Sequence, residues 1–180
     1  MASYLPVASS VFRVLREDEK PENGLCPRDC NANITVQSHV HGKIKSQFIS
    51  ATATFEAAEM FASLAVSKGK IKEEDVRIVM IDVSSIFSLA TQNYTDLTVI
   101  DLTDPATLDF HIPQSDLRAR NYVKKYKEVL IKGCIPHWRI KPFMGDLMKS
   151  NIIDNTDYSN ADDEVSDDEI SNSLLILSIE

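Results

Sequence analysis

The alternation of apolar and polar residues near the start of the chain predicts a β-strand. Residues 10–15 (SVFRVL) alternate in this way, and the strand would carry Arg13. Residues 76–83 (VRIVMIDV) are apolar at nearly every position, which predicts a strand buried on both faces. Further short extended segments are predicted at 47–52, 97–102, 128–131 and 138–142.

Two segments have the pattern of helices. Residues 55–67 carry apolar side chains along one face, with Thr54 as the N-cap and Lys68 and Gly69 closing the last turn. Residues 116–126 predict a second, short helix. The apolar face of the first helix consists of Ala57, Ala58, Phe61, Leu64 and Ala65.

The remaining segments are expected to be irregular. Residues 17–33 are polar and contain Pro21, Gly24 and Pro27, so we expect a loop with short turns. Residues 84–90 predict a helix or a turn, and the chain bracketed by the prolines at 105 and 113 is expected to be irregular. Strands dominate, and the sequence shows neither a regular βαβ rhythm nor a glycine-rich phosphate loop. The pattern therefore predicts an α+β fold.

Length and charge divide the chain into a domain and a tail. The 180 residues, 43% of them apolar, suit one domain, which we place at 1–148, followed by a tail at 149–180. Eight of the 27 acidic residues lie between positions 154 and 169, which leaves 19 acids against 19 Lys and Arg elsewhere. We expect this acidic tail to be disordered. Its apolar end, SLLILSIE, would either pack on the domain or add a strand to the sheet of a partner protein.

Composition also argues against several classes of protein. The net charge of −8 disfavours nucleic-acid binding, which needs clustered Lys and Arg. No run of about eighteen apolar residues predicts a membrane span, and the first residues lack the pattern of a secretory signal peptide. The three cysteines, Cys26, Cys30 and Cys134, argue against a disulfide scaffold, and the spacing CPRDC predicts free thiols rather than a metal or redox site. Such a low count suits a cytosolic workplace.

Four motifs follow one another in an informative order. A strand-borne arginine (VFRVLR, followed by GLCPRD) precedes SHVHGK, then FISAT leads into the first helix, and KEVLIKGCIPHWRI comes last. Over residues 11–140 this order and spacing resembles the ADP-ribosyltransferase fold of the cholera-toxin and pertussis-toxin A subunits. The resemblance implies a split β-sandwich with few helices and a cleft for NAD, the donor substrate; no metal is expected.

The resemblance assigns roles to four residues that would line the cleft. Arg13 matches the family arginine that supports the cleft and approaches the phosphate side of NAD, a task that suits the forked guanidinium. Ser50 and Thr52 match the serine and threonine of the Ser-Thr-Ser strand, which orient the glutamate and line the nicotinamide site. Their hydroxyls would share one face of the strand, and Ala51 departs from the family pattern. His39, favoured over His41 by its spacing to the next glycine, matches a histidine that holds the NAD ribose or the cleft.

Glu128 matches the catalytic glutamate of the family. Breaking the nicotinamide–ribose bond develops positive charge on the ribose, and a fixed carboxylate stabilises that charge. The rival interpretation of Glu128 is a solvated carboxylate at the end of a strand.

Tyr126 occupies the position that selects the acceptor side chain in this family. Arginine-modifying members have a second glutamate there, and pertussis-like members have glutamine. In a continuous strand Tyr126 would face the cleft beside Glu128. A phenol with a reference pKa of about 10 cannot pair with an arginine substrate as a carboxylate does. The rival interpretation is that Tyr126 ends the preceding helix and only packs.

The resemblance implies a mono-ADP-ribosyltransferase that modifies a target protein as a toxin or effector, in the cytoplasm or after delivery into a host cytosol. Two alternatives share the same cleft residues. One is an NAD glycohydrolase, in which water is the acceptor. The other is an inactive relative that works by binding a partner, with the tail as a docking segment.

Overall fold

The structure of the protein is a computed structural model that describes residues 9–42, 44–84 and 97–143. The turn or helix predicted at 84–90 lies outside the described residues except for Ser84, which is in a turn. The tail predicted at 149–180 lies outside them entirely, so its proposed disorder and docking stay predictions.

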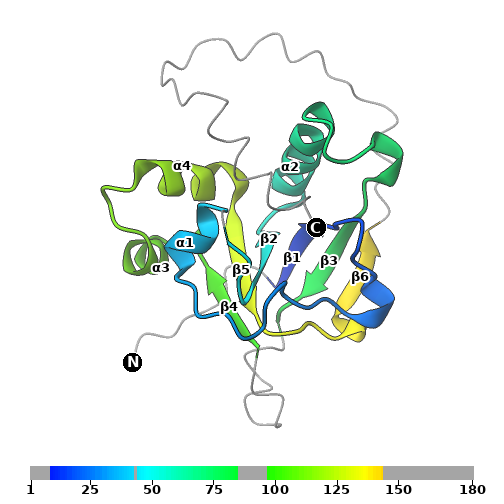
Figure 1. The fold of residues 1–180 in the computed structure, drawn as a ribbon, viewed down its shortest axis with the longest axis horizontal. Helices are drawn as coiled ribbons and strands as arrows, with labels where there is room; N and C mark the ends of the chain where they lie inside the picture. Colours follow the sequence, from blue (N-terminus) through cyan, green and yellow to red (C-terminus); the bar gives the residue numbers. More distant parts are fainter. Residues whose placement is uncertain (1–8, 43, 85–96, 144–180) are drawn as a thin grey trace.

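The described residues contain a six-stranded antiparallel sheet with the strand order β4-β5-β2-β1-β3-β6 (Figure 1). This architecture confirms the predicted α+β class, and the split β-sandwich that the resemblance implies stays a prediction. The strands are β1 (Ser10–Val14), β2 (Phe48–Thr52), β3 (Ile78–Asp82), β4 (Thr98–Asp101), β5 (Glu128–Lys132) and β6 (Ile140–Phe143). The helices are α1 (Val36–Val40), α2 (Phe55–Ser67), α3 (Pro105–His111) and α4 (Leu117–Tyr126), and short 3-10 turns lie at Pro21–Asn23, Glu73–Asp75 and His137–Arg139.

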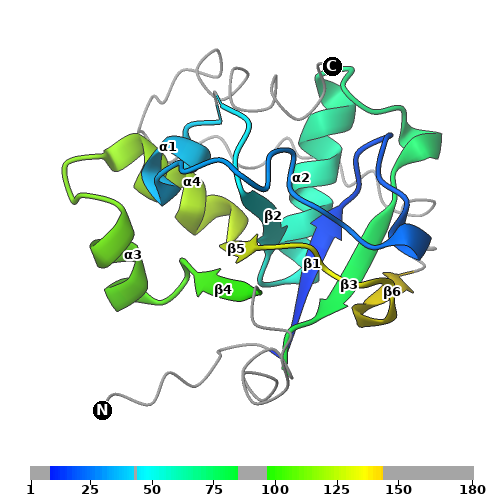
Figure 2. The ribbon, with the colours of Figure 1, turned by 60° about the horizontal axis from the view of Figure 1, so that its bottom comes forward.

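The pairing between β1 and β2 is the shortest in the sheet, and we call it the narrow joint. These two strands pair through a single register position, Phe12 opposite Thr52, whereas β1 and β3, and likewise β2 and β5, each pair through five positions. The sheet therefore consists of two well-paired halves, β4-β5-β2 and β1-β3-β6, joined over a short length. In both ribbon views α1, α3 and α4 gather beside β4 and β5, while α2 lies near β1 and β2 (Figure 1, Figure 2).

Two apolar clusters hold these layers together. The first lies across both halves of the sheet, where Ile49 and Ile131 meet Val79 and Ile81. The second lies on the other face of β2 and β5, where α1, α3 and α4 cover Phe48 and Leu130. Burying one such side chain fully contributes about 1.5–3 kcal/mol, so each cluster is a substantial source of stability.

Local capping explains where the two predicted helices begin and end. Thr54 Oγ1 accepts a hydrogen bond from the Ala57 amide at 3.2 Å at the start of α2, and the helix closes at Lys68. Asp116 accepts one from the Ala119 amide at 3.1 Å at the start of α4. Both predicted helices are confirmed, and within the described part of the chain no helix is both long and apolar enough to cross a membrane.

Two sequence predictions about local structure are wrong. The chain between the prolines at 105 and 113 is mostly the helix α3, because Asp104 caps the Thr107 amide at 2.8 Å and Pro105 suits the first helical turn. The strand β3 is not buried on both faces, since fully buried and partly exposed side chains alternate along it. Its second face is covered only in part.

The cysteines also differ from the prediction of free thiols. Cys26 and Cys134 form a disulfide with a Cα–Cα distance of 4.2 Å, and Cys30 is an exposed thiol whose sulfur lies 4.0 Å from that of Cys134. The fold brings them together because Leu25 and Ile135 pair as an isolated β-bridge. Since disulfides persist in oxidising compartments, the cysteines give no support to the expected cytosolic location.

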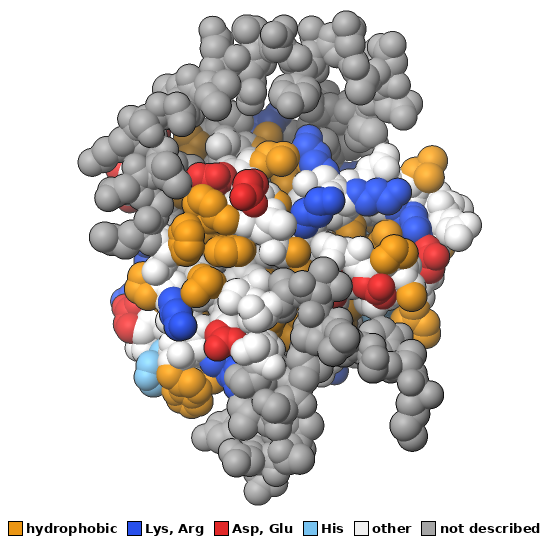
Figure 3. All heavy atoms as spheres, turned by 180° about the vertical axis from the view of Figure 1, so that it is seen from behind, with side chains coloured by type: hydrophobic (Ala, Val, Ile, Leu, Met, Phe, Trp, Pro, Cys, Tyr) orange, Lys and Arg blue, Asp and Glu red, His pale blue; other side chains and the backbone are white. Residues whose placement is uncertain are grey.

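The surface is chemically mixed. On the face shown in Figure 3, basic, acidic and apolar side chains are interspersed, with several Lys and Arg gathered towards one side. This mixture agrees with the equal numbers of acids and bases outside the acidic stretch of the tail.

Candidate active site

Among the described residues, a cleft of about 1100 Å³ lies where β1 and β2 meet. Arg13, Ser50, Thr52 and Glu128 line it, and α2 and α4 contribute apolar walls. A smaller hollow of about 60 Å³ adjoins it, shares Arg13, Ser50 and Glu128, and adds His39. The structure therefore brings the site residues predicted from the sequence to two adjoining hollows: Arg13, Ser50, Thr52, Tyr126 and Glu128 line the cleft, and His39 lines the smaller hollow beside it.

Arg13 is buried and ties the two halves of the sheet together. Its Nε and Nη2 donate to the two carboxylate oxygens of Glu19 at 3.1 and 2.8 Å, and its Nη1 donates to the backbone carbonyl of Ser50. The guanidinium thus links β1, the following loop and β2. Its predicted approach to the phosphates of NAD stays a prediction, whereas its structural role follows from these bonds.

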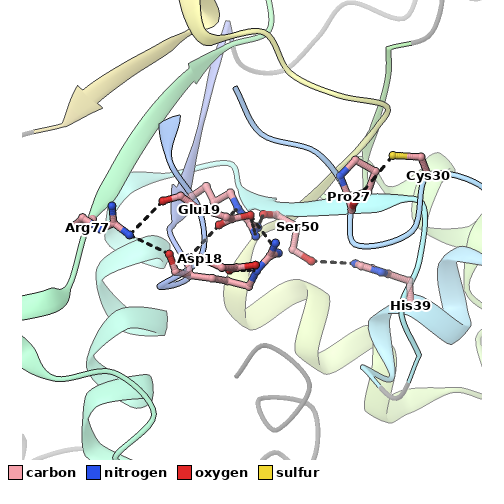
Figure 4. A network of polar contacts seen from close by, with 9 residues as sticks. Asp18, Glu19, Pro27, Cys30, His39, Ser50 and Arg77 are labelled. Atoms are coloured by element: carbon pink, nitrogen blue, oxygen red, sulfur yellow. Dashed lines mark hydrogen bonds and ion pairs between the residues drawn. The ribbon is translucent and has the colours of Figure 1, made fainter. Parts of the chain in front are cut away.

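Glu19 is the partner that the sequence analysis missed. Burial raises the pKa of this carboxyl, but the charges and hydrogen bonds of Arg13, with help from Arg16, outweigh burial and lower it overall. Arg16 adds an ion pair to Glu19 at 3.1 Å. Figure 4 shows Glu19 and Asp18 near Arg77, whose Nη2 donates to the backbone carbonyl of Glu19 at 3.2 Å. The only signal in the sequence was an acid six residues after a strand-borne arginine, inside a polar loop.

Ser50, His39 and Ser46 form a hydrogen-bonded row beside the cleft. His39 Nε2 lies 2.9 Å from Ser50 Oγ, and His39 Nδ1 lies 2.5 Å from Ser46 Oγ. Figure 4 shows the side chains of Ser50 and His39 pointing towards each other from β2 and α1. The resemblance implied that His39, rather than His41, would reach the cleft, and the structure places it in the smaller hollow that adjoins the cleft. The α1 helix, capped by Thr35, was not predicted.

The imidazole of His39 is neutral at physiological pH. Burial, followed by the nearby charge of Arg13, lowers its pKa from 6.5 to about 4. A neutral ring carries one N–H donor and one acceptor nitrogen, so His39 donates to one of its two hydroxyl partners and accepts from the other.

Glu128 is a buried carboxyl at the first residue of β5. Only 4% of the residue is exposed. Burial raises its pKa from 4.5 to about 7, although a hydrogen bond from Ser50 and the charge of Arg13 act in the opposite direction. The interpretation of Glu128 as a solvated strand end is therefore wrong. A cleft carboxyl that is close to half-ionised at pH 7 is typical of functional sites.

Thr52 faces the same cleft but is engaged by backbone groups. It lies opposite Glu128 in the register of β2 and β5. Its hydroxyl donates to the carbonyl of Thr54 at 3.0 Å and lies 3.4 Å from that of Phe12. These contacts fix the end of β2 at the narrow joint with β1. Thr52 thus shapes the cleft wall, and its predicted contact with nicotinamide stays a prediction.

Tyr126 does not lie in the strand, contrary to the geometry assumed from the sequence. It is the last residue of α4, and Lys127 then adopts a left-handed conformation with φ 49° before β5 begins. The side chain of Tyr126 is buried, and its ring packs against those of Phe61 and Tyr122 at centroid distances of 5.6 and 4.9 Å. Tyr126 also lines the cleft, from the end of α4 and not from β5.

Other cleft residues were missed by the sequence analysis. Tyr122, one helical turn before Tyr126, lines both hollows, and burial together with the charge of Glu128 raises its pKa well above 10. Arg16 and Arg28 also line both hollows. Burial, and the charge of Arg16, lower the pKa of Arg28. Arginines gathered on one side of a cleft are typical of binding sites for phosphate or carboxylate groups.

Within the described ranges, no cluster of three or more His, Cys, Asp or Glu side chains is arranged to hold a metal ion.

Comparisons with known proteins found few proteins that are similar to this chain. No family model matches it, and no curated protein matches it. Among solved structures, one called EcPltA matches with a TM-score of 0.47 and 16% sequence identity, covering 75% of this chain and 74% of that chain.

Proposed function

We propose that this protein is a mono-ADP-ribosyltransferase that transfers ADP-ribose from NAD to a target protein. The observation that carries the proposal is the buried carboxyl of Glu128, hydrogen-bonded by Ser50 on the wall of the cleft. The resemblance of the four sequence motifs to the ADP-ribosyltransferase family indicates which reaction this carboxyl would serve, namely the transfer of ADP-ribose from NAD. The geometry of the site is compatible with that chemistry, residue by residue.

The proposed reaction uses Glu128 as a preorganised negative charge. When the bond between nicotinamide and ribose breaks, positive charge develops on the ribose, and an ionised carboxylate beside it stabilises the transition state. Ser50 orients that carboxylate through its hydroxyl, and His39 in turn orients Ser50. An electron pair of the acceptor then forms the new bond to the ribose carbon, and nicotinamide carries away the electrons of the old bond.

The size and charge of the cleft suit a dinucleotide. Ligand sites in proteins commonly enclose about 300–1000 Å³, and this cleft has about 1100 Å³. Arg16 and Arg28 lie on its wall, together with Arg13, and would counter the charge of a diphosphate. The apolar rings of Phe61, Tyr122 and Tyr126 would cover a flat base or the nicotinamide ring.

The direct test combines NAD carrying a label on its adenylate part with a host-cell lysate. The wild-type protein is expected to label a lysate protein and to release nicotinamide, and Glu128→Gln is expected to do neither. Glu22→Gln, an exposed carboxyl in the first 3-10 turn, is the matched control. Equal labelling by wild type and Glu128→Gln would contradict the proposal.

NAD glycohydrolase activity is the second candidate, and the position of Tyr126 favours it. The resembled toxins have a carboxylate or an amide at this position, and Tyr126 carries neither. Its side chain is also buried at the end of α4, so this position offers no such group to pair with an acceptor. Water would then be the acceptor. Nicotinamide release that depends on Glu128, without any labelled lysate protein, distinguishes the hydrolase from the transferase. Absence of NAD binding by calorimetry would argue against both enzymes and for a binding protein.

A further inference from the structure

A row of hydrogen bonds runs from the backbone of β2 to the carboxyl of Glu128. The Phe48 amide donates to Ser46 Oγ at 3.3 Å, and Ser46 Oγ lies 2.5 Å from His39 Nδ1. His39 Nε2 lies 2.9 Å from Ser50 Oγ, and Ser50 lines both hollows together with Glu128, where a hydrogen bond from Ser50 acts to lower the pKa of that carboxyl. Ser46 and Glu128 are both buried.

The direction of each bond follows from the end at Glu128. An ionised carboxylate only accepts hydrogen bonds, so the hydroxyl proton of Ser50 points to Glu128. Ser50 Oγ is then an acceptor for His39, which requires the imidazole proton on Nε2. Since the ring is neutral, Nδ1 carries a lone pair and accepts the hydroxyl proton of Ser46. Ser46 Oγ accepts the Phe48 amide through one lone pair, and its own hydroxyl proton remains to be donated to Nδ1.

The other tautomer breaks the row at Glu128. With the proton on Nδ1, His39 would donate to Ser46, and its bare Nε2 would accept from Ser50. The single hydroxyl proton of Ser50 would then point to the imidazole and away from the carboxylate. An ionised, buried Glu128 would lose its hydrogen-bond donor, which is costly for a charged group.

We propose that Ser46 is a positioning residue that fixes the proton of His39 on Nε2 and thereby aims the hydroxyl of Ser50 at Glu128. Ser46 reaches the carboxyl only through His39 and Ser50. Neither the sequence motifs nor the residues expected to line the cleft include a role for Ser46, which lies in the segment between α1 and β2. The position of the proton on His39 can be measured whether or not the protein catalyses the proposed reaction. The expected effect of Ser46 on the turnover of NAD rests on the proposed function.

The test compares Ser46→Ala with Ser46→Thr, which keeps a hydroxyl. The matched control is Ser38→Ala, which removes the neighbouring α1 hydroxyl that pairs with Thr35 at 2.8 Å. Long-range ¹H–¹⁵N spectra at pH 9, above the pKa of Glu128 of about 7, report which nitrogen of His39 carries the proton. The His39 signals are identified by their loss in His39→Gln.

Wild type, Ser46→Thr and Ser38→Ala are expected to show the proton on Nε2, and Ser46→Ala a mixture of both tautomers. The kcat for nicotinamide release is expected to fall about tenfold in Ser46→Ala with KM within about twofold, which corresponds to the loss of about one hydrogen bond. Ser46→Thr is expected to restore it. Because the donor to the carboxylate weakens, the Glu128 pKa, followed by the ¹³C signal of its carboxyl, is expected to rise in Ser46→Ala.

Two results would overturn the proposal: wild-type His39 protonated on Nδ1 at pH 9, or unchanged nitrogen and carboxyl signals in Ser46→Ala. The spectra need no substrate. The expected spectra without any turnover of NAD by the wild type would therefore contradict the proposed reaction and leave the role of Ser46 in the hydrogen-bonded row standing.

Discussion

Two buried glutamates, Glu128 on the cleft wall and Glu19 behind the cleft residue Arg13, have carboxyls that behave in opposite ways. Glu19 on the β1 side is 6% exposed, and its pKa is lowered overall. Glu128 on the β5 side is 4% exposed, and its pKa is raised to about 7. The exposed fractions of the two residues are therefore nearly equal, and exposure alone does not explain the opposite pKa shifts.

The partners of the two carboxyls explain the difference. Glu19 receives two hydrogen bonds from the guanidinium of Arg13 and an ion pair from Arg16, which together outweigh desolvation. Glu128 has the hydroxyl of Ser50 and only a weaker contribution from the charge of Arg13. The first carboxylate is locked in the ionised state as part of the scaffold. The second titrates near neutral pH, which suits a group that acts on a substrate.

The largest expected effect is on turnover at the Glu128 side. Glu128→Gln is expected to lower kcat for nicotinamide release about 10³-fold, because the amide cannot supply the negative charge that stabilises the transition state. Single-turnover assays with NAD measure this loss. Thermal unfolding at pH 8 is the control, and the variant is expected to be at least as stable as the wild type, since it no longer buries a charge. A less than tenfold change in kcat would show that Glu128 does not act as the catalytic carboxylate.

The equivalent change on the other side is expected to act on stability. Glu19→Gln leaves the guanidinium of Arg13 buried without its carboxylate, which typically costs about 3–5 kcal/mol. Urea unfolding at pH 7 measures the free energy of unfolding. Glu17→Gln, two residues earlier and exposed, is the matched control. A cost below about 1 kcal/mol would mean that the two carboxyls are not distinguished by their partners.

The disulfide joins the two sides, so its removal is expected to weaken both. Cys26 lies in the loop that follows Glu19, and Cys134 follows β5, 108 residues away in the chain. Cys26→Ser is expected to lower the free energy of unfolding by about 2–4 kcal/mol, as is typical for native disulfides. Cys30→Ser, which removes the exposed thiol, is expected to leave it nearly unchanged. Equal effects of the two substitutions would show that the disulfide does not tie the cleft together.

The pH dependence of stability separates Glu128 from His39. The pKa of Glu128 is raised from 4.5 to about 7, so its contribution is fully present below pH 4.5 and is lost as pH rises through 7. The pKa of His39 is lowered from 6.5 to about 4, so its contribution is present above pH 6.5 and is lost as pH falls through 4. Between pH 4.5 and 6.5 the two slopes oppose each other at up to about 1.4 kcal/mol per pH unit.

Substituting Glu128 or His39 is therefore expected to change the slope of the free energy of unfolding against pH between pH 4.5 and 6.5. Relative to wild type, Glu128→Gln is expected to gain stability and His39→Gln to lose it as pH rises from 4.5 to 6.5. Urea midpoints measured at half-unit intervals of pH check both slopes. Parallel curves for all three proteins would contradict the pKa directions.

The smallest effect is expected at Tyr126. Because Tyr126→Phe keeps the ring that packs on Phe61 and Tyr122, it is expected to change nicotinamide release by less than about twofold. Target labelling is the sharper measurement. Loss of labelling with unchanged nicotinamide release would give the phenol the acceptor-selecting role that its place in the sequence suggests.

The local elements of the fold were predictable because short-range patterns specify them. The alternation around Arg13 predicted β1, and the capped, one-sided apolar pattern after Thr54 predicted α2 with its first and last residues confirmed. The order of the four motifs also identified Arg13, His39, Ser50 and Glu128 as a set, and the fold brings all four to the two adjoining hollows. The helix α3 was missed because its prolines were read as breaks, although Pro105 follows a capping aspartate.

The sequence by itself determined the residue types that meet at the cleft and the strands and helix that carry them. Only the tertiary structure decided their environments. The pairing of Arg13 with Glu19, the disulfide between Cys26 and Cys134, and the row from Ser46 to Glu128 each join segments from different elements or loops. The raised pKa of Glu128 likewise exists only when β5 is packed beside β2. Periodicity and capping act over a few residues, whereas desolvation and charge pairing depend on which distant segments share one buried space.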